Sequence, residues 1–313
     1  MKLHQWIAIL CTTLWASYAS ADQCRHGPWG PDDQIGAANR VTPARTIAAA
    51  QLVKQGRSHP LGIVIDPRMP AYPPRYAQLQ VVQPNQQFGA DAGVGWDGIY
   101  NDDILQMWLG IGPQLDGLGH MGEAGYFYNC HRGADISAIT GLTKLDISQI
   151  PPLVARGVLI DMAKYFGVEH LSAGQAIEAD DIKAALTAQD TRVNEGDIVL
   201  LHTGWTDAKL ANEPALWAAT IPGISNDAAR YLASLKPIAV GADTWGVGAV
   251  PPKAGDKLFY DHAILLKDNG IYLLETMNTG ALASEAVHEF MFVLGQPRLK
   301  GAVQMIINPV AMW

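Results

Sequence analysis

Long apolar stretches are scarce in this sequence. Beyond its first residues it has no run of about 18 apolar residues, so it predicts no membrane-spanning helix. It also lacks histidine-rich or cysteine-rich tracts and the Gly-x-Ser-x-Gly pattern of a serine nucleophile. These absences argue against a metal-scavenging protein and against a nucleophile-elbow hydrolase. No Gly/Ser linker, charge block or repeat divides the chain, so residues 22–313 are expected to form one domain.

Charged residues are also few. They make up 17% of the chain, against 49% hydrophobic residues, and the formal net charge is −8. Such a composition suits a packed globular core. The negative balance argues against nucleic acid and against anionic membranes as partners, although it does not indicate a substrate.

The first 21 residues have the pattern of an export signal. Lys2 and an apolar stretch over residues 6–16 are followed by small residues at 19–21, which suit a cleavage site. The mature chain is therefore expected to begin near Asp22 and to be secreted or periplasmic. A lipid anchor on Cys24 is the weaker alternative, because Ala-Asp-Gln precedes this cysteine instead of small apolar residues.

Two of the three cysteines remain after the signal is removed. They are Cys24 and Cys130, since Cys11 lies in the discarded segment. An oxidising compartment permits a disulfide between them. Two separate buried thiols are equally compatible with the sequence.

Strand and helix patterns alternate along the chain. Apolar, β-branched runs are typical of buried strands, and Ser/Thr caps with helical spacing indicate amphipathic helices. The expected strands are residues 158–163, 197–203 and 238–242, and the expected helices are residues 44–56 and 225–235. The proline-rich passage over residues 67–84 is expected to be a long surface loop. This alternation places the chain in the α/β class.

The segment from His262 to Glu275 predicts a β-hairpin. Two strand-like runs flank Asn269-Gly270, the strongest short signal for a two-residue turn. In that register His262 and Glu275 are diagonal neighbours on one face, with Cβ atoms roughly 7 Å apart. A slip of one residue would send them to opposite faces. We therefore expect both side chains to reach one metal ion only in this register.

Asp116 and His120 form a second group of metal-binding residue types. They are four residues apart, which brings them together on one helical turn or across a tight glycine-containing bend. A hydrolase without a serine or cysteine nucleophile usually activates water with a metal, which needs several such side chains at one point. Alone, this spacing is more often that of surface or capping residues. The metal hypothesis therefore requires the two groups to meet.

Together these motifs resemble the bacterial kynurenine formamidase and cyclase-like family of metal hydrolases. His262 and Glu275 match the histidine and glutamate that bind metal late in the family sequence, and Asp116 to His120 fall on its His-x-Gly-Thr-His-x-Asp motif. Further matching stretches are residues 29–39, 196–205, 222–230 and 241–244. The resemblance runs from about Trp29 to Pro309.

This chain departs from the family motif in several places. It has Asp116 where the motif opens with histidine, Gly122 where the motif has its aspartate, and Tyr126 where the family has a general acid/base histidine. Glu123 and His131 are the nearest replacements. Longer family members resemble this form, so the changes are expected to mark a subgroup.

The resemblance implies a swivelling β/β/α fold with a curved, barrel-like central sheet, outer helices and a homodimer. The metal ligands it implies are Asp116, His120, His262 and Glu275, with Zn²⁺ or Mn²⁺ as the divalent ion and Glu275 or His131 as the catalytic base. The implied substrate is N-formylkynurenine or another aryl formamide, with isatin-like lactams and unsaturated lactones as competitors. An exported small-molecule binding protein without turnover is the alternative function.

Other residues have ordinary interpretations beside functional ones. His202 ends an apolar strand and is more often a core histidine than a ligand. Asp243 follows a strand where α/β proteins gather site residues, although family likeness favours a structural role. Some tryptophans could line an aromatic pocket or pack in the core, namely Trp29, Trp96, Trp108 and Trp205.

Overall fold

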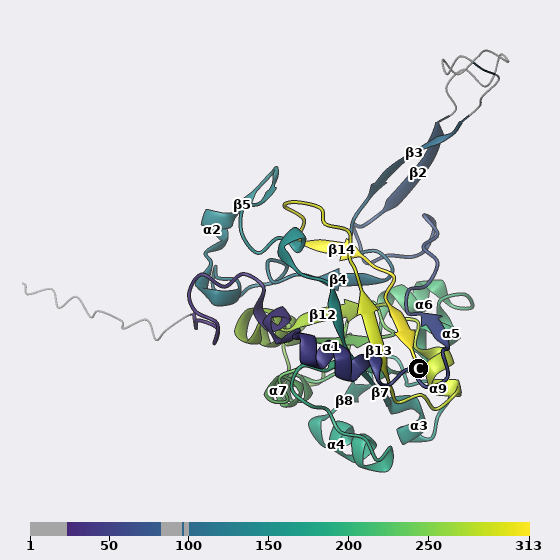
Figure 1. The fold of residues 1–313 in the computed structure, drawn as a ribbon. Coiled ribbons are helices and arrows are strands. Elements are labelled where there is room, and N and C mark those ends of the chain that lie inside the picture. Colours follow the sequence, from purple (N-terminus) through teal and green to yellow (C-terminus); the bar gives the residue numbers. More distant parts are fainter. Residues whose placement is uncertain (1–23, 83–95, 97–99) are drawn as a thin grey trace, which may run out of the picture.

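A nine-stranded sheet organises the computed structural model, which describes residues 24–82, 96 and 100–313 (Figure 1). Its order is β1-β15-β13-β7-β9-β11-β12-β4-β14. These strands are β1 (Ser58–Pro60), β4 (Gln114–Asp116), β7 (Leu153–Asp161), β9 (Ile198–His202), β11 (Ala239–Ala242), β12 (Tyr272–Glu275), β13 (Glu289–Leu294), β14 (Gln304–Ile306) and β15 (Val310–Met312). The expected export signal lies outside the described residues.

Three small two-stranded sheets and short helices complete the described part of the chain. The small sheets pair β2 (Ala77–Val82) with β3 (Asp102–Met107), β5 (Ser137–Ala138) with β6 (Gly141–Leu142), and β8 (Ala176–Ile177) with β10 (Gly223–Ile224). The helical elements are η1 (Gly36–Arg40), α1 (Pro43–Ala50), η3 (Tyr128–Cys130), α2 (Gly133–Ile136), η4 (Ile147–Gln149), α3 (Met162–Phe166), α4 (Ala179–Ala188), α5 (Trp205–Lys209), α6 (Pro214–Ala219), α7 (Asn226–Ser234), α8 (Tyr260–His262), η5 (Ala263–Lys267) and α9 (Gly280–Ser284). None of them is long and apolar enough to cross a membrane.

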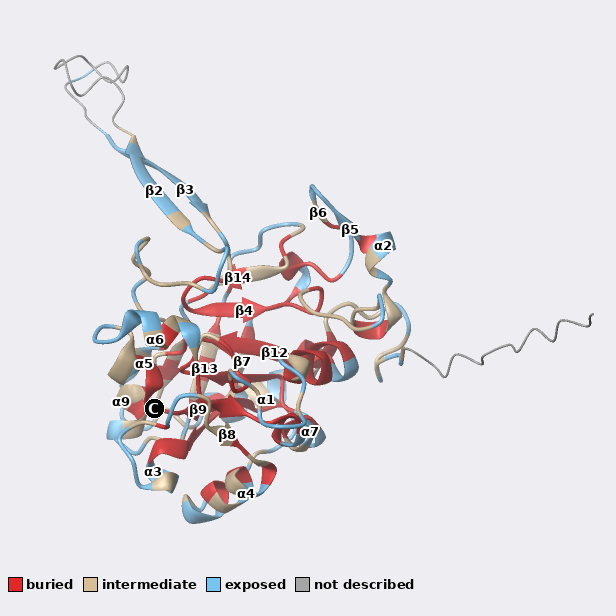
Figure 2. Cartoon of the chain, turned by 180° about the vertical axis from the view of Figure 1, so that it is seen from behind, coloured by how far each residue is buried: buried red, intermediate tan, exposed pale blue. Residues whose placement is uncertain are grey.

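The centre of the large sheet is parallel and fully buried. β7, β9, β11 and β12 run parallel to one another, and every residue of β9, β11 and β12 is buried (Figure 2). Strands covered on both faces need apolar side chains on both, which explains the continuous apolar runs. The predicted strands at 197–203 and 238–242 contain β9 and β11. The one at 158–163 covers only the end of β7, because helix α3 begins at Met162. The α/β class, with a curled sheet and outer helices, is confirmed.

Two predicted helices begin where their caps indicate. Ser225 accepts a hydrogen bond from the Ala228 amide at the start of α7, and Thr42 accepts one from the Arg45 amide at the start of α1. Helix α1 ends at Ala50, earlier than the expected Gly56. The following backbone turns to join the sheet, where the Gln55 and Arg57 amides donate to the Trp313 carbonyl. Bonding to the C-terminal strand therefore replaces the last helical turns.

The hairpin predicted between His262 and Glu275 is wrong. His262 ends α8 and the apolar residues after it form η5, a π-helical turn. Asn269 and Gly270 end this helix: the Asn269 side chain donates to the Ile264 carbonyl at 2.7 Å, and Gly270 has φ +63°. Asn-Gly suits a left-handed helix end as well as a hairpin turn, and a short buried apolar run fits either element.

The expected loop at 67–84 is partly wrong because it contains β2. Residues 83 and 84 lie outside the described part of the chain. The ribbon of β2 and β3 projects away from the body of the molecule in both Figure 1 and Figure 2. Its two strands pair only with one another among the described strands. The alternation of apolar and polar residues over residues 77–82 is the strand signal behind β2.

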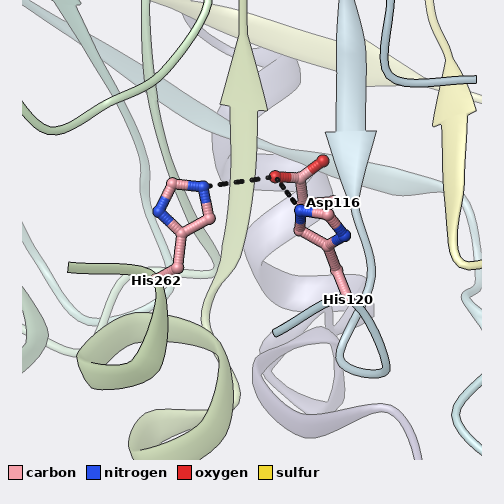
Figure 3. Close-up of side chains that lie close together, drawn as sticks. All are labelled: Asp116, His120 and His262. Atoms are coloured by element: carbon pink, nitrogen blue, oxygen red, sulfur yellow. Dashed lines mark ion pairs between the residues drawn. The ribbon is translucent and has the colours of Figure 1, made fainter. Parts of the chain in front are cut away.

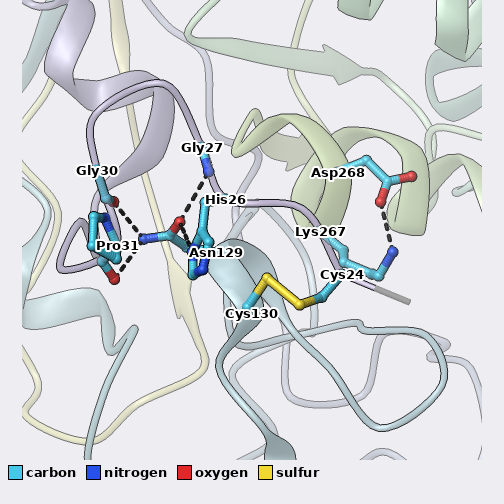
Figure 4. The surroundings of a disulfide bond; sticks show 9 residues. All are labelled: Cys24, His26, Gly27, Gly30, Pro31, Asn129, Cys130, Lys267 and Asp268. Carbon is cyan, nitrogen blue, oxygen red and sulfur yellow. Dashed lines mark hydrogen bonds and ion pairs between the residues drawn. A yellow bond between two sulfur atoms is a disulfide. The ribbon is translucent and has the colours of Figure 1, made fainter. Parts of the chain in front are cut away.

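A disulfide joins Cys24 to Cys130 (Figure 4). Beside it, Asn129 fastens the N-terminal segment: its side-chain oxygen accepts from the Gly27 amide at 2.9 Å, and its amide group donates to the carbonyls of Gly30 and Pro31. Of the two alternatives that the sequence left open, the structure has the paired cysteines.

Candidate metal centre

Strand register brings four polar side chains to one face of the sheet edge. Gln114 and Asp116 are two residues apart on β4, so they share a face, while Leu115 between them is buried on the other. Glu275 on β12 lies opposite Gln114, and Gln304 on β14 lies opposite Asp116. Directly opposite residues in antiparallel strands have adjacent side chains. The sheet therefore places two carboxylates beside two amides.

The amides occupy one oxygen of each carboxylate. Gln114 Nε2 donates to Glu275 Oε2 at 2.6 Å and to Asp116 Oδ1 at 3.1 Å, and Gln304 Nε2 donates to Asp116 Oδ1 at 2.6 Å. The other oxygens, Asp116 Oδ2 and Glu275 Oε1, are buried and make no hydrogen bond. A buried polar atom without a partner is costly. Each carboxylate therefore offers one oxygen to a further ligand.

Two histidines approach the free oxygen of Asp116 from other segments of the chain (Figure 3). His120 follows β4 across a tight turn, in which its amide donates to the Gly117 carbonyl, and its Nε2 lies 3.8 Å from Asp116 Oδ2. His262 comes from α8, and its Nε2 lies 3.7 Å from Asp116 Oδ2 and 3.3 Å from Glu275 Oε1. Helix and strand thus bring His262 and Glu275 together, where the sequence predicted two strands.

Asp261 fixes the orientation of the His262 ring. Its Oδ2 lies 2.8 Å from His262 Nδ1, and both side chains are buried. In the tautomer that donates from Nδ1 to this carboxylate, Nε2 presents its lone pair to the cluster. A histidine that binds metal is commonly oriented in this way.

The donor set fits a divalent metal ion. Ligand atoms of Asp116, His120 and His262 lie within 4.8 Å of one another. Unpaired carboxylate oxygens beside imidazole nitrogens are donors that Zn²⁺ and Mn²⁺ accept, and a cation would neutralise the buried negative charge. Glu275 Oε1 lies next to this set.

Burial and neighbouring charges shift the pKa values of Glu275, His120 and His262 in this cluster. Burial, reinforced by the Asp116 charge, raises the pKa of Glu275 to about 7. Burial lowers the pKa of His120. For His262 burial opposes protonation, but the Asp261 and Glu275 carboxylates outweigh it and raise the pKa well above its ordinary value. Metal binding in such a cluster must release protons.

A cavity of about 130 Å³ opens onto the cluster. Its wall includes Tyr72, Trp245 and Phe259, whose rings form tilted and edge contacts at centroid distances of 5.3 to 6.4 Å. Arg75 also lines it, as do His120, His262 and Glu275. His120, His262 and Glu275 of the candidate metal centre are thus accessible from a small aromatic chamber.

Sequence reasoning missed several residues of this chamber. No sequence motif singled out Trp245, Phe259, Tyr72 or Arg75. None of the four tryptophans proposed from the sequence lines the cavity: Trp205 is buried beside Trp217, Trp29 lies under the Arg40 guanidinium, and Trp96 and Trp108 are exposed. The position of Trp245 shortly after β11, at the end of a parallel strand, was the signal that could have found it.

The structure does not bring His131 or Glu123 to the cavity. His131 is half-buried near Lys144 and Asp32, and burial lowers its pKa. Glu123 instead contacts Lys267 at 3.6 Å and accepts from the Tyr260 hydroxyl. At Gly122 a Cβ would collide with the Tyr126 carbonyl oxygen, so this backbone has no room for the family's aspartate.

His202 and Asp243 lie within the structural core. His202 Nδ1 is 2.8 Å from the Thr279 hydroxyl, and Asp243 Oδ1 accepts from the Thr203 amide and hydroxyl. Both are buried, and neither lines the metal-centre cavity. These contacts agree with the structural interpretation of the two residues.

Comparison with known proteins gives the family. The family model described as "Putative cyclase" matches residues 58–249. A crystal structure described as that of a novel cyclase is 30% identical, with a TM-score of 0.83 over 92% of this chain and 98% of that chain. The chain belongs to the cyclase family. This cyclase-family assignment confirms the resemblance drawn from the sequence.

Other solved structures share the cyclase fold at lower identity. Isatin hydrolase A from Ralstonia solanacearum is 17% identical, with a TM-score of 0.62 over 87% of this chain and 97% of that chain. A "predicted metal-dependent hydrolase" from Bacillus stearothermophilus is also 17% identical, with a TM-score of 0.54 over 82% and 98%. These two likenesses establish the shared fold. No curated protein matches the sequence.

Proposed function

We propose that this cyclase-family protein is a metal-dependent hydrolase of small amide, lactam or lactone bonds. The observation that carries the proposal is the meeting of two unpaired buried carboxylate oxygens with two imidazoles at an aromatic cavity. Neighbours in fold described as an isatin hydrolase and a metal-dependent hydrolase support it. Aryl formamides such as N-formylkynurenine, isatin-like lactams and unsaturated lactones are the substrates to compare.

Asp116, His120 and His262 would hold the ion, with Glu275 beside them. Carboxylate and imidazole ligands suit Zn²⁺ or Mn²⁺. A bound ion of this kind polarises a carbonyl and lowers the pKa of a bound water.

Glu275 is the proposed general base. Gln114 holds its Oε2, which leaves Oε1 free at the cavity. Glu275 accepts a proton from the attacking water as the water oxygen bonds to the substrate carbonyl carbon. It returns the proton to the leaving nitrogen or oxygen as the C–N or C–O bond breaks. The Trp245 and Phe259 rings enclose the substrate and limit the access of bulk water.

A binding protein without turnover is the second candidate. Gly122 and Tyr126 favour it, because they stand where the resembled family has a ligand and an acid/base histidine. Such a protein would keep the aromatic cavity and bind the same compounds unchanged.

Metal analysis and turnover assays separate these candidates. The purified protein is expected to contain about one or more equivalents of Zn²⁺ or Mn²⁺, and to hydrolyse at least one of formanilide, isatin or a dienelactone until a chelator is added. His262→Ala should lower metal content and reduce kcat/KM by at least about 100-fold. His170→Ala is the matched control, because His170 lies outside the cavity. Ligand binding without turnover would select the second candidate, and metal-independent hydrolysis would contradict the first.

We also propose that the protein is exported to the periplasm or beyond and acts there as a homodimer. The pattern of residues 1–21 supports export, and the Cys24–Cys130 disulfide is compatible with an oxidising compartment. Small molecules are the proposed partners, with neither nucleic acid nor membrane.

The projecting ribbon supports the homodimer. Leu79 faces Leu105 across the two strands, and with Ala77, Val81 and Met107 they give the ribbon a mainly apolar face, which also carries Asp103 opposite Val81. Leu79, Val81 and Leu105 are each about half exposed. A two-stranded ribbon alone is only marginally stable in water.

The same molecule carries an apolar groove of about 670 Å³. Ile63, Val64 and Leu294 line it, and Val64 is 92% exposed. The groove and the ribbon face are both apolar, so packing one against the other would remove both from water. We therefore propose that a second copy of the chain covers the ribbon.

A further inference from the structure

Arg75 brings a positive charge to the wall of the candidate metal centre. The turn that precedes β2 fixes it, since its amide donates to the Tyr72 carbonyl. Its Nη1 donates to the Gly110 carbonyl at 2.5 Å, just before β4. A Cβ at Gly110 would lie 2.6 Å from this Nη1, so glycine is needed for the guanidinium to sit there. The turn before β2 and the Gly110 carbonyl before β4 therefore position Arg75 at the cavity.

The guanidinium has no carboxylate partner among the described residues. Its hydrogen bond goes to a neutral carbonyl, whereas the nearby carboxylates of Asp116 and Glu275 bond to Gln114 and approach the histidines. A guanidinium carries five N–H donors in a planar fork. Arg75 therefore retains donors for an anionic group inside the cavity, in the geometry that suits a carboxylate.

The rest of the cavity limits the shape of such an anion. About 130 Å³ is small beside the roughly 300–1,000 Å³ of drug-sized ligand sites. Tyr72, Trp245 and Phe259 present aromatic rings, which favour a flat, conjugated ligand. The cavity thus has an aromatic wall, the positive charge of Arg75 and the proposed reaction centre.

We propose that Arg75 binds a carboxylate of the substrate, so that the enzyme prefers flat, unsaturated acids over their neutral analogues. This inference rests on the proposed hydrolase function and makes Arg75 a specificity-determining residue. It favours acidic formamides and lactones that carry a carboxylate over isatin, which is neutral. The carboxylate at Arg75 would be separate from the bond that is cleaved.

A matched substrate pair tests the proposal. 2-Formamidobenzoate and formanilide share the same cleavable formamide and differ in the carboxylate. We expect wild-type kcat/KM to favour the acid by about 10- to 100-fold, the usual range for a charge-assisted hydrogen bond. Arg75→Gln can still donate to the Gly110 carbonyl but lacks the charge, and should reduce this preference to within a few-fold. Arg75→Lys should retain part of it.

Arg68→Gln is the control, because Arg68 lies on the same loop, is exposed and pairs with Asp66 away from the cavity. It should leave the substrate preference as in the wild type. An equal loss for both substrates in Arg75→Gln would overturn the proposal and indicate an effect on the reacting carbonyl. A preference that survives in Arg75→Gln would overturn it as well.

Calorimetry with benzoate and benzamide gives a readout that does not need turnover. Wild-type protein should bind benzoate more tightly, and Arg75→Gln should lose that difference. If none of the two formamides, isatin and a dienelactone is hydrolysed but benzoate binding depends on Arg75, the hydrolase proposal fails, whereas the assignment of Arg75 as the carboxylate-binding residue of the cavity stands. If chelation removes benzoate binding while Arg75→Gln keeps it, the carboxylate binds the metal and the inference is wrong.

Discussion

At the scale of single residues, the site depends on amides that hold charged groups in place. Gln114 bonds to both carboxylates, and Gln304 adds a second bond to Asp116. These bonds leave one oxygen of each carboxylate for a cation. The same arrangement makes the metal-free site costly, because burial without a counter-ion disfavours ionised Glu275.

Glu275→Gln should stabilise the metal-free protein at alkaline pH. The folded-state pKa of Glu275 is about 7, above its ordinary value of 4.5, so the folded state binds a proton more tightly than the unfolded state. The stability from this group is present below about pH 4.5 and is lost as pH rises through about 7. Urea unfolding of chelator-treated protein at pH 8 should show the variant more stable by at most about 3 kcal/mol. At pH 5 most of the difference should vanish.

Glu213→Gln serves as the control for this comparison. Glu213 is exposed and pairs with Lys209 on the surface, so its replacement should change stability little at either pH. Saturating metal should reverse the order of wild type and the Glu275 variant, because the ion stabilises the ionised carboxylate. A stability difference that does not change with pH would contradict the raised pKa.

The sequence predicted the central residues of the site but not their supporting contacts. Asp116, His120, His262 and Glu275 stood out because their types and order resembled a family motif. The contact of Gln304 with Asp116 depends on which strand lies beside β4, over a separation of 188 residues. Strand order of this kind does not follow from local periodicity. Local sequence patterns therefore could not predict that the two glutamines and Arg75 lie at the site.

At the scale of elements, the end of η5 decides where β12 begins. Gly270 has φ +63°, its nitrogen bonds to the Leu266 carbonyl, and its own carbonyl accepts from the Ala37 amide. A Cβ there would lie 2.6 Å from the Tyr128 ring and 3.0 Å from Gly36 Cα. The glycine is thus required by both its backbone conformation and its close contacts.

Gly270→Ala should therefore destabilise the protein by roughly 2–4 kcal/mol, combining left-handed strain with overpacking. Gly56→Ala is the matched control: Gly56 has φ +68° but no atom within 4 Å of the added Cβ. It should cost only the conformational part, about 1–2 kcal/mol. Denaturant melts of both variants measure the difference. Equal losses would show that the contacts of Gly270 contribute nothing.

Local sequence patterns predicted some elements better than others. The buried strands β9 and β11 and the capped helix α7 followed from apolar runs and from Ser225. The segment before Gly270 was ambiguous, because five buried residues in η5 fit a strand or a helical turn equally. Because η5 is buried on all sides, its sequence does not show the periodicity of apolar residues that distinguishes a strand from a helix.

At the scale of the whole molecule, the Cys24–Cys130 disulfide joins two segments that are far apart in the sequence. It spans 106 positions and ties the N-terminal segment beside Asn129. Restricting so long a loop in the unfolded chain should stabilise the fold by about 2–4 kcal/mol. Cys24→Ser/Cys130→Ser should lower stability by this amount in denaturant melts. If reduction of the wild type, measured alongside, has no effect on the midpoint, the bond does not stabilise the fold.

The exposed ribbon leads to a prediction about assembly. If a second copy covers the apolar face of β2 and β3, Leu79→Asp places a charge in that interface and should weaken dimerisation by at least about 100-fold. Gln80→Asp is the matched control, because Gln80 is the next residue on the same strand and points to the opposite face. Sedimentation equilibrium of wild type and both variants measures the dissociation constants. Either a monomeric wild type or a Leu79→Asp dimer as tight as the Gln80→Asp one would show that the ribbon does not join two copies.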